Sequence, residues 1–218
     1  MRNLIIFGDS QFSERISKYI IAEGKDNLIA FTQEKQYMKR CDINNYKVIP
    51  FEELSSVHEE FEIILGVGYS NMNTLREKIY KLCKSAGYKV GTYISAHAIC
   101  YTEDIGDGNF VCPGAVIGPG CIIGKANYFA SCVVLSHDNQ VGDFNFISTS
   151  TVFGGFARVK DRCFFGLNST VKDNVVVANE NLIGSAANVI KSISYVGGVY
   201  IGNPAHELTD RNVKTIEI

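Results

Sequence analysis

The sequence has no tryptophan, only four prolines and no long apolar run. Its first apolar stretch ends at Gly8, which leaves it too short for the core of a secretory signal peptide. No stretch approaches the roughly 18 consecutive apolar residues of a membrane span. We therefore expect a cytoplasmic protein that does not bind a membrane.

Neither sign of charge dominates, since the chain contains 21 Lys and Arg and 23 Asp and Glu. A nucleic-acid-binding protein normally carries a basic face, so this balance argues against a nucleic-acid partner. The seven cysteines are odd in number and include no C-x-x-C pair, which favours free thiols in a reducing compartment. Because clustered Cys and His ligands are also missing, we predict no metal site.

Residues 1–92 alternate short apolar runs with amphipathic segments. Phe12, Ile16 and Ile20 recur at helical spacing, with Ser13 as the candidate N-cap. Apolar runs of strand length lie before and after this segment, and a second helical stripe covers 72–86. Such strand–helix alternation predicts an α/β, Rossmann-like N-terminal domain over 1–92.

Residues 93–218 follow a different rule, because apolar residues recur there at every sixth position. From Ile105 to Val189 all 15 residues at this spacing are apolar, although only 46% of the chain is. Chance would produce one such register about once in 10⁵. A period of six predicts a left-handed parallel β-helix, in which three hexads form a coil of about 18 residues and the apolar residue points inward.

Glycine is abundant in this second region. Seven of the 20 glycines directly follow an inward position: Gly106, Gly118, Gly124, Gly142, Gly154, Gly166 and Gly184. We expect them to form the tight corners of the coils, because glycine adopts backbone conformations that other residues avoid. No hexad is interrupted, so no large loop is predicted to leave the β-helix.

His137 is the only one of four histidines inside the regular repeat, and Asp138 follows it. It comes two residues after the inward Leu135, so its side chain should point outward near a corner. A histidine beside a carboxylate suits general-base catalysis, and a solvated surface histidine is the alternative. Gly155 lies one coil further on, and neighbouring parallel strands are about 4.8 Å apart. Its N–H could therefore hold an oxyanion formed near His137.

The segment from Gly8 to Ser13 reads as a degraded G-x-G-x-x-G that keeps only its first glycine. As a dinucleotide fingerprint it is incomplete. It can still offer backbone N–H groups to a phosphate at the N-terminus of a helix.

Five stretches together resemble one family, the hexapeptide-repeat sugar acyltransferases of the sialic-acid O-acetyltransferase type. That family includes N-acetyltransferases of nucleotide-linked 4-amino-4,6-dideoxy sugars. The stretches are VGYSNMNTLREKIYKLCKSAGYKVGTYIS (67–95), SHDNQVGDF (136–144), GGFARVKDRCFFGLNSTV (154–171), IGSAANVIK (183–191) and VYIGNPAHEL (199–208). The resemblance implies acetyl-CoA as co-substrate, direct transfer without a metal, and a homotrimer that holds CoA between neighbouring β-helices. It also implies a place in surface-polysaccharide synthesis, such as that of O-antigen or lipopolysaccharide.

The resemblance also implies roles for individual residues. His137 matches the catalytic base, Asp138 the acidic residue that tunes it, and Gly155 the amide that meets the thioester carbonyl. The positions that match acyl-CoA-binding residues are Gly155, Gly184, Ser185, Gly202 and Pro204. The positions that match nucleotide-binding residues are Gly8, Ser10, Gln11, Phe12, Thr32 and Gly68.

Two departures from the family pattern leave questions open. Relatives that bind uridine nucleotides often have an Asp pair where this chain has Phe31 and Thr32, so the choice between UDP and dTDP is open. Some relatives have a second active-site histidine at the place of Phe146. The alternatives to sugar N-acetylation are sugar O-acetylation and a non-enzymatic trimeric scaffold. A sugar nucleotidyltransferase ranks last, because its glycine-rich N-terminal signature with arginine is missing.

Overall fold

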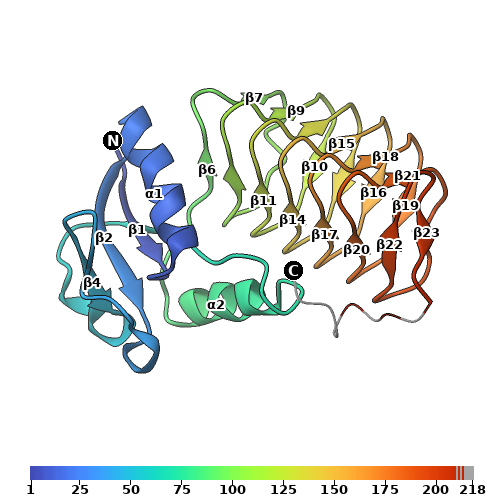
Figure 1. Cartoon of the computed structure of the whole chain (residues 1–218). Coiled ribbons are helices and arrows are strands. Elements are labelled where there is room, and N and C mark those ends of the chain that lie inside the picture. Colours follow the sequence, from blue (N-terminus) through green and yellow to red (C-terminus); the bar gives the residue numbers. More distant parts are fainter. Residues whose placement is uncertain (210, 212, 214–218) are drawn as a thin grey trace.

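The computed structural model describes residues 1–209, 211 and 213. A small α/β domain leads into a long stack of β-strand coils, and the two parts pack against each other (Figure 1). In this described part of the chain, no helix combines the length and the apolar character needed to cross a membrane.

The N-terminal domain is built on a five-stranded sheet with the order β3-β4-β2-β1-β5. Neighbouring strands are parallel except β3 and β4. The strands are β1 (Asn3–Phe7), β2 (Asn27–Gln33), β3 (Asp42–Ile43), β4 (Tyr46–Pro50) and β5 (Glu62–Leu65). The helices are α1 (Gln11–Glu23), α2 (Thr74–Ser85) and the short 3₁₀ helices η1 (Lys35–Tyr37) and η2 (Phe51–Ser56). This is the Rossmann-like fold that the sequence predicts, and the strand order reverses at β1, where such sheets open a crevice.

Helix α1 begins where a serine can satisfy its first N–H groups. The cap is Ser10, whose Oγ accepts a hydrogen bond from the Ser13 N–H at 3.4 Å. The prediction of Ser13 as the cap is wrong, because Ser13 lies inside the first turn and its hydroxyl donates to the Ser10 carbonyl at 2.7 Å. The helix ends at Gly24 in the left-handed conformation.

The remaining strands form three parallel sheets, which confirms the predicted left-handed parallel β-helix. The eight-stranded sheet holds β6 (Tyr93–Ile94), β8 (Phe110–Val111), β11 (Tyr128–Phe129), β14 (Phe146–Ile147), β17 (Phe164–Phe165), β20 (Leu182–Ile183), β22 (Val199–Ile201) and the antiparallel β23 (His206–Glu207). The six-stranded sheet holds β7 (Ile99–Cys100), β9 (Val116–Ile117), β12 (Val134–Leu135), β15 (Val152–Phe153), β18 (Thr170–Val171) and β21 (Asn188–Val189). The four-stranded sheet holds β10 (Ile122–Ile123), β13 (Gln140–Val141), β16 (Arg158–Val159) and β19 (Val176–Val177).

The inward stack is the core of the β-helix. Of the 15 predicted inward residues, 14 are at most 3% exposed, and Ile105 in the first coil is the partly exposed one. Buried asparagines also form a ladder, in which Asn109 Oδ1 accepts from the Asn127 N–H at 2.8 Å and Asn127 Oδ1 accepts from the Asn145 N–H at 2.8 Å. The coils are thus held together by apolar contact and by satisfied buried amides.

The corners are made differently from the prediction. From Ile105 to Ile183, the left-handed residue comes three positions after each inward residue and is often not glycine, as at Asp138 (φ 54°) and Arg162 (φ 54°). The seven predicted corner glycines do not have positive φ. They are small because the next coil lies against them: a β-carbon at Gly118 would lie 1.8 Å from the Ser136 carbonyl oxygen. Close approach of coils, rather than backbone freedom, explains these glycines.

The α/β domain covers the outer face of the eight-stranded sheet. That face carries a ladder of stacked rings: Tyr93, Phe110, Tyr128, Phe146 and Phe164. Phe12 of α1 packs edge-on against Tyr128 with ring centroids 5.1 Å apart. At the edge between the four- and eight-stranded sheets, Arg162 pairs with Glu77 of α2 at 3.1 Å. Aromatic and ionic contacts therefore hold the domain on one side of the β-helix (Figure 1).

Candidate functional site

His137 lies at the edge between the six-stranded and four-stranded sheets, in the turn that joins β12 to β13. Its Nδ1 lies 2.9 Å from Asp138 Oδ2. Asp138 occupies the left-handed corner position of this coil. When Nδ1–H donates to the carboxylate, Nε2 is left free to accept a proton. The pair therefore has the arrangement of a general base and its orienting group.

The next coil encloses the imidazole. Phe156 donates its N–H to the His137 carbonyl at 3.0 Å, and its ring lies edge-on to the imidazole with centroids 5.0 Å apart. Gly155 lies so close that a β-carbon there would be 2.5 Å from His137 Nε2. Within the described part of the chain, the Gly155 N–H donates to no other group. A free backbone donor thus lies beside a free imidazole nitrogen, as the one-coil spacing predicts.

This site is open to solvent in a single chain. The side chains of His137 and Asp138 are 52% and 48% exposed. The nearby apolar side chains of Val152 and Phe156 are also exposed. In residues 1–209, 211 and 213, no group of three or more His, Cys, Asp or Glu residues comes together in a way that could hold a metal ion.

The other predicted acyl-CoA residues lie apart from His137. Gly184 and Ser185 follow β20, so they lie at the edge between the eight- and six-stranded sheets. Gly202 follows β22, and its carbonyl accepts from the Asn188 N–H at 3.0 Å. Pro204 lines a cavity of about 240 Å³ at the C-terminal end of the β-helix. The structure therefore brings Gly155 to His137, but not these four residues.

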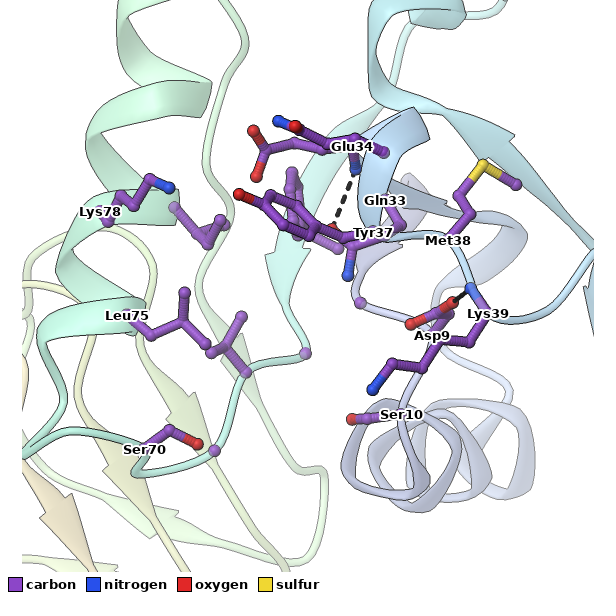
Figure 2. A pocket seen from close by; sticks show the side chains of 17 residues that line it. Asp9, Ser10, Gln33, Glu34, Tyr37, Met38, Lys39, Ser70, Leu75 and Lys78 are labelled. Atoms are coloured by element: carbon purple, nitrogen blue, oxygen red, sulfur yellow. Dashed lines mark hydrogen bonds between the residues drawn. The ribbon is translucent and has the colours of Figure 1, made fainter.

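A second cavity, of about 680 Å³, opens in the α/β domain at the carboxyl ends of β1, β2 and β5 (Figure 2). This is the size of a site for a small organic ligand. Gly8, Ser10 and Gly68 line it, as the sequence predicts.

Three other predicted nucleotide-binding residues, Gln11, Phe12 and Thr32, do not line this cavity. Phe12 is turned toward the aromatic ladder, where it packs on Tyr128. Thr32 is fully buried within β2, and its carbonyl accepts from the Gly8 N–H at 2.7 Å. Gln11 is exposed in the first turn of α1.

The segment after β2 contributes residues that the sequence analysis missed, among them Glu34, Tyr37 and Lys39. Lys78 of α2 faces them from the opposite wall (Figure 2). Buried Asp9 holds the segment in place, since its carboxylate accepts hydrogen bonds from the backbone N–H groups of Lys39 and Arg40. The sequence could have indicated this segment, because a strand that lies next to β1 in a parallel sheet ends at the same edge as the Gly8 loop. The residues that follow β2 are therefore expected near that loop.

The two sites lie on opposite sides of the β-helix. The α/β domain, with its cavity, covers the eight-stranded face. His137 lies at the edge where the other two sheets meet, which is the edge opposite that face. A ligand in the cavity of one chain is thus separated from the histidine of the same chain by the body of the β-helix.

These features define a two-domain class, a Rossmann-like domain on a left-handed β-helix with a histidine–carboxylate pair at one edge. Residues 3–82, which make up most of the first domain, match the family model described as the PglD N-terminal domain. The resemblance that the sequence motifs indicate is thereby confirmed.

Solved structures share the fold of the whole chain. The acetyltransferase domain of PglB from Neisseria gonorrhoeae FA1090, in complex with acetyl coenzyme A, is 22% identical with a TM-score of 0.83, covering 95% of this chain and 99% of that one. PerB from Caulobacter crescentus, in complex with CoA and GDP-perosamine, is 18% identical with a TM-score of 0.80, covering 95% and 97%. WeeI from Acinetobacter baumannii AYE is 19% identical with a TM-score of 0.78, covering 95% and 100%.

A sequence relative covers only part of the chain. An acyl-[acyl-carrier-protein]–UDP-N-acetylglucosamine O-acyltransferase from Synechocystis sp. is 32% identical over 102 residues, which are 47% of this chain. The chain spans about a third of the length of that relative, 35%.

Proposed function

We propose that this protein is an acetyl-CoA-dependent N-acetyltransferase that acts on the amino group of a nucleotide-linked 4-amino-4,6-dideoxy sugar. The observation that carries the proposal is the His137–Asp138 pair, beside which the Gly155 N–H donates to no group in the part of the chain that the structure describes. The solved relatives that bind acetyl-CoA, or CoA with GDP-perosamine, support the same chemistry. The nucleotide is UDP or dTDP, held by the cavity that Gly8, Ser10 and Gly68 line.

In the proposed reaction the sugar amine attacks the thioester carbonyl carbon, forming a C–N bond and an oxyanion. His137 Nε2 accepts the proton that the nitrogen loses, and the Asp138 carboxylate stabilises the imidazolium. The Gly155 N–H donates to the oxyanion. When the intermediate collapses, the C–S bond breaks and His137 returns its proton to the departing thiolate. Every step is direct, so no covalent enzyme intermediate and no metal take part.

We propose that the working form is a homotrimer with its reaction sites between copies. A chain cannot bring a sugar from its own cavity to its own His137, because the β-helix lies between them. It also holds Gly184 and Ser185 at a different edge from His137. A neighbouring β-helix packed along these edges brings the Gly184 and Ser185 of one chain to the His137 of another. The exposed side chains of Ile122, Val152, Phe156 and Leu167 provide apolar contacts for it.

The activity is tested by mass spectrometry of acetyl-CoA mixed with UDP- and dTDP-linked 4-amino sugars. We expect acetylation at the amine, and a loss of kcat of about 10²-fold or more in His137→Ala, as for a lost general base. The melting temperature should change little, because the side chain is half-exposed. His58→Ala, at an exposed histidine of the α/β domain, is the matched control. A loss below threefold in His137→Ala would favour a non-enzymatic scaffold.

The arrangement between copies has its own test. Ser10→Glu places a negative charge at the phosphate end of the cavity, and His137→Ala removes the base. Each variant alone should be inactive, whereas mixed oligomers from co-expression should regain activity at interfaces that combine an intact cavity with an intact base. No recovery in mixed oligomers would show that the reaction site lies within one chain.

A sugar O-acetyltransferase is the second candidate. It is favoured by the Synechocystis relative, whose name describes an O-acyltransferase. The same base and amide serve a hydroxyl nucleophile equally well. Acetylation of hydroxyl sugars alone, in the same mass-spectrometric assay, would select this alternative.

A further inference from the structure

The peptide that joins Gly154 to Gly155 is held differently from the peptides on either side of it. Before it, the Gly154 N–H donates to the Val171 carbonyl at 2.9 Å, and after it, the Gly155 carbonyl accepts from the Asn174 N–H at 2.9 Å. In the described part of the chain, the peptide between them has one hydrogen bond. It comes from the side chain of Asn139, whose Nδ2 donates to the Gly154 carbonyl at 2.6 Å. Because neither glycine has a β-carbon, this peptide can turn unless that bond fixes it.

This same peptide carries the N–H that the proposed reaction uses. The peptide is trans, so its C=O and its N–H point in opposite directions. Asn139 is only 1% exposed, and it bonds the carbonyl from the interior of the β-helix. The Gly155 N–H therefore points outward, toward the side on which the half-exposed His137 lies. A donor on the carbonyl also polarises the peptide, which makes its N–H a stronger donor.

At another edge of the β-helix the corresponding N–H is already bonded. Between the four- and eight-stranded sheets, the Lys125 N–H donates to the carboxylate of Asp143 in the next coil at 2.7 Å. At the histidine edge, the corresponding residue of the next coil is Asp173, whose carboxylate accepts from the Asn174 side chain at 3.0 Å instead. Among the residues that the structure describes, no group accepts from the Gly155 N–H. Its carbonyl is fixed, and its N–H is left for a ligand.

The fold does not require an amide at position 139. The equivalent positions in three other coils hold small or apolar side chains that are also buried: Cys121, Ala157 and Val175. The amide of Asn139 also costs stability, because nothing in residues 1–209, 211 and 213 donates to its buried Oδ1. Asn109, by contrast, uses both ends of its amide, since Nδ2 donates to two carbonyls and Oδ1 accepts from the next coil. The bond to the Gly154 carbonyl is therefore what the Asn139 side chain contributes.

We infer that Asn139 is a positioning residue for the proposed reaction: it fixes the Gly154–Gly155 peptide so that the Gly155 N–H points at the oxyanion. This inference rests on the proposed function and adds to it a buried residue that touches neither substrate. Without the amide, the peptide adopts other orientations and the oxyanion loses part of its stabilisation. Substrate binding and the His137–Asp138 pair stay as they are.

The experiment measures steady-state kinetics in the acetyl-transfer assay together with thermal melting. Asn139→Ala should lower kcat about 10-fold, the effect of one hydrogen bond, and leave both KM values within about twofold. Its melting temperature should stay within about 3 °C, because alanine stands at this position one coil further on and the unpaired oxygen is removed. The pH dependence of kcat should keep its midpoint. Asn139→Cys should recover part of kcat, since the Cys121 thiol one coil earlier donates to the Ser136 carbonyl at 3.4 Å.

Asn109→Ala is the matched control. It removes the same kind of bond from another edge, where Asn109 Nδ2 donates to the Gly124 carbonyl at 2.8 Å. This variant should melt at a lower temperature, because it also breaks the ladder of buried asparagines. Below that temperature its kcat should stay within about twofold of the natural value.

The outcomes separate the inference from the proposed function. The role of Asn139 is overturned, while acetyl transfer still stands, if Asn139→Ala keeps kcat within about twofold or if Asn109→Ala loses as much. A raised KM with an unchanged kcat, a shifted pH profile, or an Asn139→Cys variant no faster than Asn139→Ala also overturns it. A natural protein that transfers acetyl to none of the sugars overturns both the inference and the proposed function.

Discussion

Gly155→Ala tests the geometry of the proposed reaction site most directly. The φ angle of Gly155 is not positive, so its backbone accepts an alanine. The new β-carbon would lie 2.5 Å from His137 Nε2 and 2.6 Å from Cε1. Since non-bonded heavy atoms pack at about 3.5 Å, the imidazole must move by roughly 1 Å. The half-exposed ring can move outward into solvent, so the coil need not unfold.

A displacement of about 1 Å at a reacting group lowers the rate by about 10²-fold. We therefore expect kcat of Gly155→Ala to fall by about that factor in an assay of CoA release, with a melting temperature within about 3 °C of the natural protein. Gly154→Ala is the matched control, because its β-carbon would lie 2.5 Å from the backbone nitrogen of Asp173 and cannot be relieved by a side-chain movement. That variant should lose thermal stability instead.

The reasoning is refuted if Gly155→Ala keeps its kcat within threefold of the natural protein. It is also refuted if both glycine variants lose activity only in proportion to their loss of stability. Either result would mean that the imidazole is not held where the amide and the base can act together.

Three further predictions concern other parts of the molecule. Asp138→Asn should lower kcat about 10- to 100-fold without lowering stability, since the amide cannot stabilise the imidazolium; unchanged kcat would remove Asp138 from the mechanism. Phe165→Ala should lower the free energy of unfolding in urea by about 3–5 kcal/mol, because the ring is fully buried in the inward stack, and a change below about 1 kcal/mol would contradict that packing. Burial raises the pKa of Cys83 and Cys163 to about 12 and of Cys112 to about 11, so these thiols stay protonated below those values. Burial also raises the pKa of Cys121, so iodoacetamide at pH 8, read by mass spectrometry, should label the exposed Cys41 and Cys132 and spare all four buried thiols.

The β-helix could be predicted from the sequence because its geometry repeats along the chain. Each inward residue meets equivalents about 18 positions away, so one period describes the whole core. Ile105 is less buried than the others because it lies in the first coil, where its described strand partner is Ile123 alone. The six-residue period predicted correctly where the small residues lie. It did not predict why they are small, because the distance between neighbouring coils is a property of the folded structure.

The histidine edge was predictable for the same reason. His137, Asp138 and Gly155 are brought together by adjacency in the sequence and by the length of one coil. The cavity that we propose for the nucleotide was only partly predictable. Phe12 faces the aromatic ladder and Thr32 is buried inside the sheet, while the wall after β2 belongs to a short segment without periodicity.

The sequence by itself determined the two domain types, the register of the coils and the residues that meet across one coil, because all of these follow from local periodicity. Only the tertiary structure decided which face of the β-helix the α/β domain covers. That choice depends on single long-range contacts, such as Phe12 with Tyr128 and Arg162 with Glu77, which leave no period in the sequence. It places the proposed nucleotide cavity and His137 on opposite sides of the β-helix, which supports the arrangement between copies that the family resemblance implies.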